Sequence, residues 1–326
     1  MTTRVAVIDV GTVTARLAIA DVESDHVARI SRRSTIVNLG EDVDKTGVLK
    51  ETACERLLAC IDGYLAQIAQ ADVATVCCTL TSAARDARNS ADLLGALADR
   101  NLKAQVIPGE IEGMLTFLGV AQDFPSSRLL VADNGGGSTE FALGSLSMQR
   151  TPQLDFVRSI DVGCRRITEK FLSRTNPPSA DDLAAAHEFA AQAFEPVFGW
   201  KNGEMEVPDR VVVTGGTATT LVAVHKSLVP YESRYVHLST LSRSMVEEEE
   251  RLLSGITVEQ RATLPGIQPK RAPVILGGTV AVCEIMRTTG FDEVTVSESD
   301  LLYGLSLTVA ATVDGRPSPV GWVPQL

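Results

Sequence analysis

Asp133-Asn134-Gly135-Gly136-Gly137-Ser138-Thr139-Glu140 decides the fold class of this chain. An apolar run precedes it at 129–132 and another follows it at 141–143. The pattern therefore predicts a strand that ends on an aspartate, turns through three glycines and returns as a second strand. A glycine-rich hairpin without a function is the alternative. Three glycines between two carboxylates favour a turn that binds phosphate, because glycine lets backbone N–H groups approach an anion closely.

The residues of this turn divide into two kinds of ligand. Asp133 and Glu140 offer hard carboxylate oxygens, which suit a divalent cation. Backbone amides and a hydroxyl group suit phosphate oxygens, and the candidate phosphate ligands are Gly135, Gly136, Gly137 and Ser138.

An earlier stretch has the same layout. Strand 5–9, a turn and strand 13–20 match strand 129–133, the glycine turn and strand 139–144, and Asp9 stands 124 residues before Asp133. Alone, Asp9-Val10-Gly11-Thr12 is a weak signal, but two copies indicate an internal duplication. We expect Gly11, Thr12 and Val13 to bind phosphate through their amides and Asp9 to reach the metal through water.

The rest of the chain alternates strands and helices. Buried strands are predicted at 4–10, 73–79 and 210–214, and helices at 50–70, 82–99, 110–122, 164–173, 180–194, 217–228, 243–254, 273–289 and from 300 onward. This pattern predicts a mixed α/β fold of two similar halves with a cleft between them. We place one domain at 1–121 plus 300–326, with the first hairpin, and the other at 122–299, with the second hairpin.

Composition narrows the functional classes. The chain has 326 residues, 44% of them hydrophobic and 22% charged, which is typical of a soluble protein with two domains. No apolar run approaches the roughly 20 residues that span a membrane. Because the first residues enter a strand directly, we expect no signal segment. The six cysteines include no CxxC pair, so we expect reduced core residues in a cytoplasmic protein. Four scattered histidines argue against a histidine zinc site.

Net charge restricts the partners. A charge of −11 and an aromatic content of 5% argue against nucleic-acid binding. A polyanionic substrate would need a local basic group. Arg29, Arg32 and Arg33 form one candidate, and a solvated strand edge is the alternative.

The duplicated hairpins resemble the sugar kinase/Hsp70/actin superfamily. Within it, the chain from about residue 5 to 307 resembles the exopolyphosphatase/guanosine pentaphosphate phosphohydrolase family, in its short two-domain form. The matching segments are TSAARDA at 81–87, GEIEGMLTFLGV at 109–120, GGGSTE at 135–140, GGTATT at 215–220, VILGG at 274–278 and VTVSE at 294–298.

This resemblance implies two duplicated ribonuclease H-like (actin-like ATPase) domains with an interdomain cleft. It places Glu112 as the general base, Arg85 facing the substrate, and Gly215 and Gly216 beside the ligand. It also implies Mg²⁺, with Mn²⁺ as an alternative, and a homodimer. From the residues alone, Glu112 could be a surface glutamate, Arg85 a structural ion-pair partner and Gly215-Gly216 an ordinary turn. We expect Gly113 and Gly119 to let the helix of Glu112 pack closely against a glycine turn.

Three functions follow as expectations. The first is an exopolyphosphatase that releases terminal orthophosphate from inorganic polyphosphate. The second is a pppGpp 5′-phosphohydrolase that gives ppGpp, and the third is a weakly active or non-catalytic polyphosphate or alarmone binder. A small-molecule kinase of the superfamily is a further class, which the glutamate helix disfavours. Four positions depart from the family pattern and bear on activity: Val13, Asn38, Asn134 and Tyr303.

Overall fold

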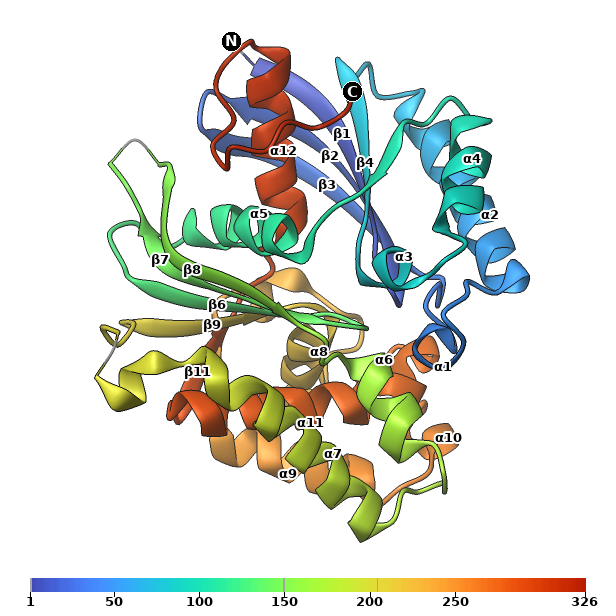
Figure 1. The fold of residues 1–326 in the computed structure, drawn as a ribbon, viewed down its shortest axis with the longest axis vertical. Helices are drawn as coiled ribbons and strands as arrows, with labels where there is room; N and C mark the ends of the chain where they lie inside the picture. Colours follow the sequence, from blue (N-terminus) through green and yellow to red (C-terminus); the bar gives the residue numbers. More distant parts are fainter. Residues whose placement is uncertain (1, 149, 204) are drawn as a thin grey trace. The chain divides into compact units, whose positions relative to one another are not determined.

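A computed structural model describes residues 2–148, 150–203 and 205–326 (Figure 1). The chain forms two compact units. Unit 1 contains the chain up to Ser126 together with Ser145–Leu154 and Ser299–Leu326, and unit 2 contains Ser127–Gly144 and Asp155–Glu298. The boundaries we expected, 1–121 plus 300–326 and 122–299, differ at the tip of one hairpin. This tip joins unit 1 because Arg150 donates hydrogen bonds to the side-chain oxygen of Gln122, one of them over 2.8 Å.

Unit 1 is a five-stranded sheet with helices on both faces. The strand order is β3-β2-β1-β4-β5, in which β1 pairs antiparallel with β2 and parallel with β4. Its strands are β1 (Thr2–Val10), β2 (Thr14–Glu23), β3 (His26–Ile36), β4 (Thr75–Leu80) and β5 (Ala104–Val106). Its helices are α1 (Val43–Thr46), α2 (Glu51–Ile68), α3 (Ser82–Asp86), α4 (Ser90–Ala98), α5 (Gly109–Ala121) and α12 (Leu301–Val313).

The two faces of this sheet have separate apolar cores. Helices α2 and α4 lie on one face, and α5 and α12 lie on the other (Figure 1). Alternate residues of each strand serve the two faces, as strand geometry requires. In β1, for example, Ile8 belongs to the first core and Val7 to the second.

Unit 2 is built around a six-stranded sheet with the order β10-β11-β9-β6-β7-β8. Its strands are β6 (Leu129–Asn134), β7 (Thr139–Leu146), β8 (Pro152–Ile160), β9 (Arg210–Thr214), β10 (Ser239–Ser242) and β11 (Glu293–Val296). Its helices are α6 (Cys164–Ile167), α7 (Ala180–Phe194), α8 (Gly216–His225), α9 (Arg243–Ser254), α10 (Val258–Arg261) and α11 (Ala272–Thr289), with shorter turns η1 (Thr168–Leu172), η2 (Glu195–Val197), η3 (Gly199–Asn202), η4 (Ser233–Tyr235) and η5 (Pro269–Arg271).

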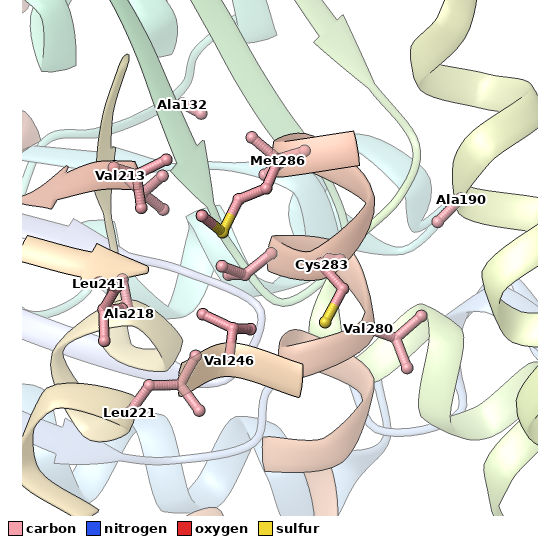
Figure 2. Close-up of a cluster of buried hydrophobic side chains, with 14 of the residues drawn as sticks. Ala132, Ala190, Val213, Ala218, Leu221, Leu241, Val246, Val280, Cys283 and Met286 are labelled. Atoms are coloured by element: carbon pink, nitrogen blue, oxygen red, sulfur yellow. The ribbon is translucent and has the colours of Figure 1, made fainter. Parts of the chain in front are cut away.

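Helix α11 is central to the core of unit 2. Nearly all of its residues are buried, and its side chains meet those of the sheet, α8 and α9 (Figure 2). Burial of this many aliphatic side chains fixes the position of β6 and β9, whose ends carry the candidate ligands.

The two sheets repeat one topology. The order β3-β2-β1-β4-β5 of unit 1 corresponds to β8-β7-β6-β9-β11 of unit 2, and β10 adds one edge strand. In both, an antiparallel hairpin is followed by strands that pair in parallel. The predicted duplication is therefore present in the fold as well as in the sequence.

Most predicted elements form, and two differ. The helix expected at 82–99 is two helices, α3 and α4, separated at residues 87–89. The segment 164–173 is one turn of α-helix followed by the π-helical turn η1. The short strand β10 and the one-turn helices α1 and α10 were not predicted. Among the described residues, no helix is long and apolar enough to cross a membrane. All six cysteines are free thiols, four of them buried.

Candidate active site

The two predicted phosphate turns have the same backbone hydrogen bond. In unit 1 the amide of Gly11 donates to the carbonyl oxygen of Thr14 over 2.9 Å. In unit 2 the amide of Gly135 donates to the carbonyl oxygen of Ser138 over 3.0 Å. A Cβ atom at either glycine would lie 3.2 Å from that same oxygen, which is a tight contact. The duplication therefore extends to the hydrogen bond that closes each turn.

In unit 1 a following segment holds the turn from behind. The amides of Val37 and Asn38 both donate to the carbonyl oxygen of Val13, over 3.0 and 2.9 Å, and the amide of Gly40 donates to Thr12 over 2.8 Å. Gly40 packs so closely that a Cβ there would lie 2.3 Å from the Thr12 methyl group. Asn38 has a φ of 52°, a left-handed conformation that asparagine adopts more readily than most residues.

In unit 2 the segment after β8 has the same role. The amide of Cys164 donates to Gly135, the amides of Arg165 and Arg166 donate to Gly136, and the Arg166 side chain donates from Nε to the Gly137 carbonyl oxygen over 2.7 Å. Gly163 makes this possible, because a Cβ there would lie 2.5 Å from the backbone of Gly136.

These contacts orient the amides of both turns. The C=O of one residue and the N–H of the next point in opposite directions across a trans peptide. Because the carbonyls are held from behind, the N–H groups of Val13 and Thr14 in unit 1, and of Gly136, Gly137 and Ser138 in unit 2, point away from the supporting segments. Converging backbone N–H groups of this kind make an anion-binding site.

Two carboxylates stand at the base of the second turn. Asp133 and Glu140 are directly opposite one another across β6 and β7, so their side chains share one face with Cβ atoms about 5 Å apart. The Ser159 hydroxyl donates to Oε1 of Glu140 over 2.7 Å. Among the described residues, no three His, Cys, Asp or Glu side chains gather as a metal site. Two carboxylates still fit Mg²⁺, which takes its other ligands from water and substrate phosphate.

The N-terminus of α8 borders this pair. Gly215 has a φ of 100°, and a Cβ there would lie 3.2 Å from Oδ1 of Asp133. At Gly216 a Cβ would lie 2.2 Å from the guanidinium group of Arg271. Burial raises the pKa of the Cys164 thiol, and the charges of Arg271 and Arg165 oppose that rise, so both arginines lie near the segment that supports the turn.

The carboxylate of the first hairpin is held by an arginine. Asp9 is buried, and its Oδ2 accepts hydrogen bonds from Nη2 and Nε of Arg16 over 2.7 and 3.0 Å. Arg16 also donates from Nη1 to Oδ2 of Asp300 over 2.5 Å, and Oδ1 of Asp300 caps α12 at Leu302. Burial raises the pKa of Asp9 above its ordinary value, and Arg16 opposes this rise. Oδ1 of Asp9 accepts no hydrogen bond within the described residues.

Glu112 lies in the first turn of α5 and is largely buried. Its Oε2 accepts a hydrogen bond of 2.7 Å from Nη1 of Arg85, which also donates to the carbonyl oxygen of Ile107 over 3.1 Å. The structure therefore brings together the residues predicted as base and as phosphate ligand. It does not place Glu112 on the solvated face of its helix.

Helix α5 is fixed by its contact with α12. A Cβ at Gly119 would lie 2.2 Å from the carbonyl oxygen of Asp300, and one at Gly304 would lie 1.8 Å from that of Leu115. We expected Gly119 to pack against a glycine turn, and this expectation is wrong. The short side chains instead let two helices cross closely, so the helix with Glu112 is anchored to the helix that begins at Asp300.

Sequence reasoning missed several residues of these sites. Arg16, Arg165, Arg166 and Arg271 were not predicted. Arg16 lies four residues after the Asp-x-Gly-Thr motif, and its proximity to that motif was the available signal. No motif pointed to Arg165, Arg166 or Arg271. Two departures from the family pattern have structural roles: Asn38 supports the first turn, and Asn134 donates to the Thr139 hydroxyl over 2.9 Å, which in turn donates to the carbonyl oxygen of Val162.

Known proteins that resemble this chain in sequence and structure include exopolyphosphatases and members of one phosphatase family. The sequence model of the Ppx/GppA phosphatase family matches residues 18–310. Exopolyphosphatase 2 of Mycobacterium tuberculosis is 35% identical, over 94% of this chain and 99% of that protein. The crystal structure of the Aquifex aeolicus member of the Ppx/GppA family is 29% identical with a TM-score of 0.77, over 94% of this chain and 97% of its own. An exopolyphosphatase structure from Cytophaga hutchinsonii is 25% identical with a TM-score of 0.82, over 98% of this chain and 100% of its own. These structures confirm the predicted fold class.

Proposed function

Because the chain belongs to the Ppx/GppA phosphatase family, as its motifs predicted, we propose that it is an exopolyphosphatase that releases terminal orthophosphate from inorganic polyphosphate. The observation that carries the proposal is the repeated turn. In each unit, the carbonyl groups accept hydrogen bonds from a supporting segment, and the N–H groups on the other side of the turn could bind an anion. Phosphoanhydride hydrolysis depends mainly on positioning and on neutralising phosphate oxygens, and such turns supply both.

Unit 1 provides the groups that act on water. Glu112 is the general base, which accepts the proton of the attacking water at a carboxylate oxygen. Arg85 fixes the orientation of this carboxylate, and its guanidinium group is the type that pairs with phosphate. The amides of Thr12 and Val13 hold substrate oxygens. The amide of Gly11, which we expected to bind phosphate as well, instead donates to the carbonyl oxygen of Thr14 and closes the turn. Asp9 is held by hydrogen bonds from Arg16, which favour its charged form against the effect of burial, and it would contribute to the metal through water.

Unit 2 provides the grip on the phosphate and the metal ligands. The amides of Gly136, Gly137 and Ser138 bind phosphate oxygens, and the α8 N-terminus at Gly215-Gly216 adds a positive dipole end. Arg271, beside that terminus, strengthens the local positive field. Asp133 and Glu140 would hold Mg²⁺, with Mn²⁺ as an alternative. When bound, the ion neutralises phosphate oxygens and stabilises the leaving group.

Two other functions rank below this one. The pppGpp phosphohydrolases belong to the same family and use the same chemistry, but the relative with the highest identity reported above is an exopolyphosphatase. A small-molecule kinase would need an acceptor hydroxyl in place of water. The buried base Glu112 next to an anion-binding arginine favours hydrolysis.

The proposal also covers the state of the protein in the cell. We place it in the cytoplasm as a homodimer without nucleic-acid partners. Free cysteines and a net charge of −11 support this placement. Light scattering of the purified chain tests the dimer.

Phosphate release from long polyphosphate, tripolyphosphate and pppGpp, each with and without Mg²⁺, tests the function. We expect metal-dependent release from polyphosphate and slower release from pppGpp. Faster release from pppGpp would reverse the order of the two hydrolases. Binding of polyphosphate without any release would favour the non-catalytic binder.

A further inference from the structure

Three arginines of strand β3 were considered one basic group from the sequence, and the structure divides them. Successive side chains of a strand point to opposite faces. Arg32 is paired with Ala18 in the sheet and lies over the ring of Tyr303 on α12, 5.6 Å from its centre. Arg29 and Arg33 lie on the other face, together with Ser31 and Thr35. We call Arg29 and Arg33 the β3 arginine pair.

The β3 arginine pair lies on the free edge of the sheet in unit 1. Strand β3 is outermost, and Arg29 and Arg33 are both exposed. Within the described residues neither makes an ion pair. Arg29 stands opposite Asp21, but that carboxylate is already bound to Arg4 at 2.6 Å. Two positive charges are thus left available on a chain whose net charge is −11.

The two arginines lie at increasing distances along β3 from the first phosphate turn. Ile36, at the end of β3, is paired with Thr14, where the turn ends, and Arg33 is paired with Leu17. At about 3.3 Å per residue, Arg33 lies about 10 Å along the strand from that turn and Arg29 about 23 Å from it. Beyond Arg29 the surface becomes acidic, with Glu23 and Asp25 beside His26.

We infer that the β3 arginine pair is a binding site for the distal phosphates of a long linear polyanion whose terminal phosphate occupies the turn at Gly11. This inference rests on the proposed function for the position of the terminal phosphate. Guanidinium groups pair with phosphate oxygens in a fixed fork geometry. The site selects long chains over short ones, because tripolyphosphate is much shorter than the distance from the turn to Arg29.

The competing role is protection of the edge strand. Charged side chains on an exposed edge discourage pairing with another chain. That role predicts aggregation when the arginines are neutralised and no effect on the choice of substrate.

The double variant Arg29→Gln/Arg33→Gln tests the inference. We expect its KM for long polyphosphate to rise about fivefold, from two exposed ion contacts. We expect its KM for tripolyphosphate and its kcat to stay unchanged, and its KM for the long chain to depend less on salt. The control is Arg158→Gln/Arg251→Gln, which removes two exposed arginines elsewhere, one of them on the edge strand β8.

Binding of long polyphosphate, measured by calorimetry beside the kinetics, distinguishes failure of the distal phosphate site from failure of the hydrolase assignment. Weaker binding by the β3 variant but not by the control supports the site even if the wild type releases no phosphate, in which case only the hydrolase assignment fails. Equal loss in both variants, equal effects on short and long chains, or aggregation of the β3 variant with unchanged binding would overturn the inference.

Discussion

Arg85 donates a hydrogen bond from Nη1 to Oε2 of Glu112 over 2.7 Å, and the same nitrogen donates to the carbonyl oxygen of Ile107 over 3.1 Å. One guanidinium group thus ties the first turn of α5 to the segment that precedes it. An arginine in this position can both orient a carboxylate and offer its other N–H groups to an anion.

Substitution of Arg85 should therefore lower kcat. We expect Arg85→Met to reduce kcat about 100-fold, because Glu112 loses its orientation as general base. Arg85→Lys should recover only part of this loss, since an ammonium group lacks the fork geometry. Arg88→Met is the matched control, because Arg88 is exposed and donates to the carbonyl oxygen of Thr46. If all three variants kept the wild-type kcat, the hydrogen bond between Arg85 and Glu112 would have no role in catalysis.

Arg16 should control the ionisation of Asp9. Burial gives Asp9 a higher pKa in the folded protein than in the unfolded chain. The stability from this carboxyl is therefore complete below the unfolded pKa and is lost as the pH rises through the folded pKa. Arg16→Met raises the folded pKa further, so we expect a destabilisation of about 3 kcal/mol at pH 8 and a smaller one at pH 4.

Urea unfolding at the two pH values measures this effect. The double variant Asp9→Asn/Arg16→Met should lose most of the pH dependence, because the buried charge is gone. A destabilisation by Arg16→Met that is equal at pH 4 and pH 8 would mean that packing, and not the charge of Asp9, is responsible.

Alanine substitution should destabilise the protein at Gly163 and Gly40, which lie in the supporting segments, but not at a glycine inside a helix. Gly163→Ala forces a Cβ to within 2.5 Å of the Gly136 backbone, which cannot move aside, so we expect a loss of about 2 kcal/mol and weaker phosphate binding. Gly40→Ala meets a threonine methyl group and should have a smaller effect. Gly95→Ala in α4 has open space and should stabilise by up to about 1 kcal/mol. Thermal unfolding and phosphate titration of the three variants test this order.

The sequence predicted these turns because their pattern is local. Two copies of an aspartate, glycines and flanking apolar runs, 124 residues apart, are visible without any knowledge of distant contacts. The supporting segments were not predicted. Val37–Gly40 meets the first turn, and Gly163–Arg166 the second, only after β3 and β8 have paired.

The same limit explains the misjudged residues. Asn38 and Asn134 differ from the family pattern, but their roles are a left-handed backbone and a cross-strand hydrogen bond, which only the folded chain reveals. Gly119 was placed correctly in a close contact, yet its partner, α12, lies about 180 residues away in the sequence. Strand β10 has only four residues, too few for a periodic pattern.

Glu249 should destabilise unit 2 at neutral and higher pH. It is buried in α9, and burial raises its pKa to about 8. Both of its carboxylate oxygens lack a hydrogen-bond partner within the described part of the chain. The folded state therefore favours the protonated form, and stability is lost as the pH rises from the unfolded pKa through about 8.

Glu249→Gln should thus stabilise the protein by about 2 kcal/mol at pH 8 and have little effect at pH 4. Glu293→Gln is the control, since Glu293 is exposed at the start of β11 and is not among the groups that raise the pKa of Glu249. Chemical unfolding of both variants at the two pH values gives the comparison. Destabilisation by Glu249→Gln at pH 8 would show that the carboxylate is needed in its charged form.

The general base is the central claim, and Glu112→Gln tests it most directly. The amide keeps the size of the side chain and its hydrogen bond to Arg85 but cannot accept a proton from water. We predict that kcat for long polyphosphate falls about 100-fold or more, while the dissociation constant for polyphosphate, measured on the same preparation, changes little. A variant that binds polyphosphate and retains the wild-type kcat would contradict the account.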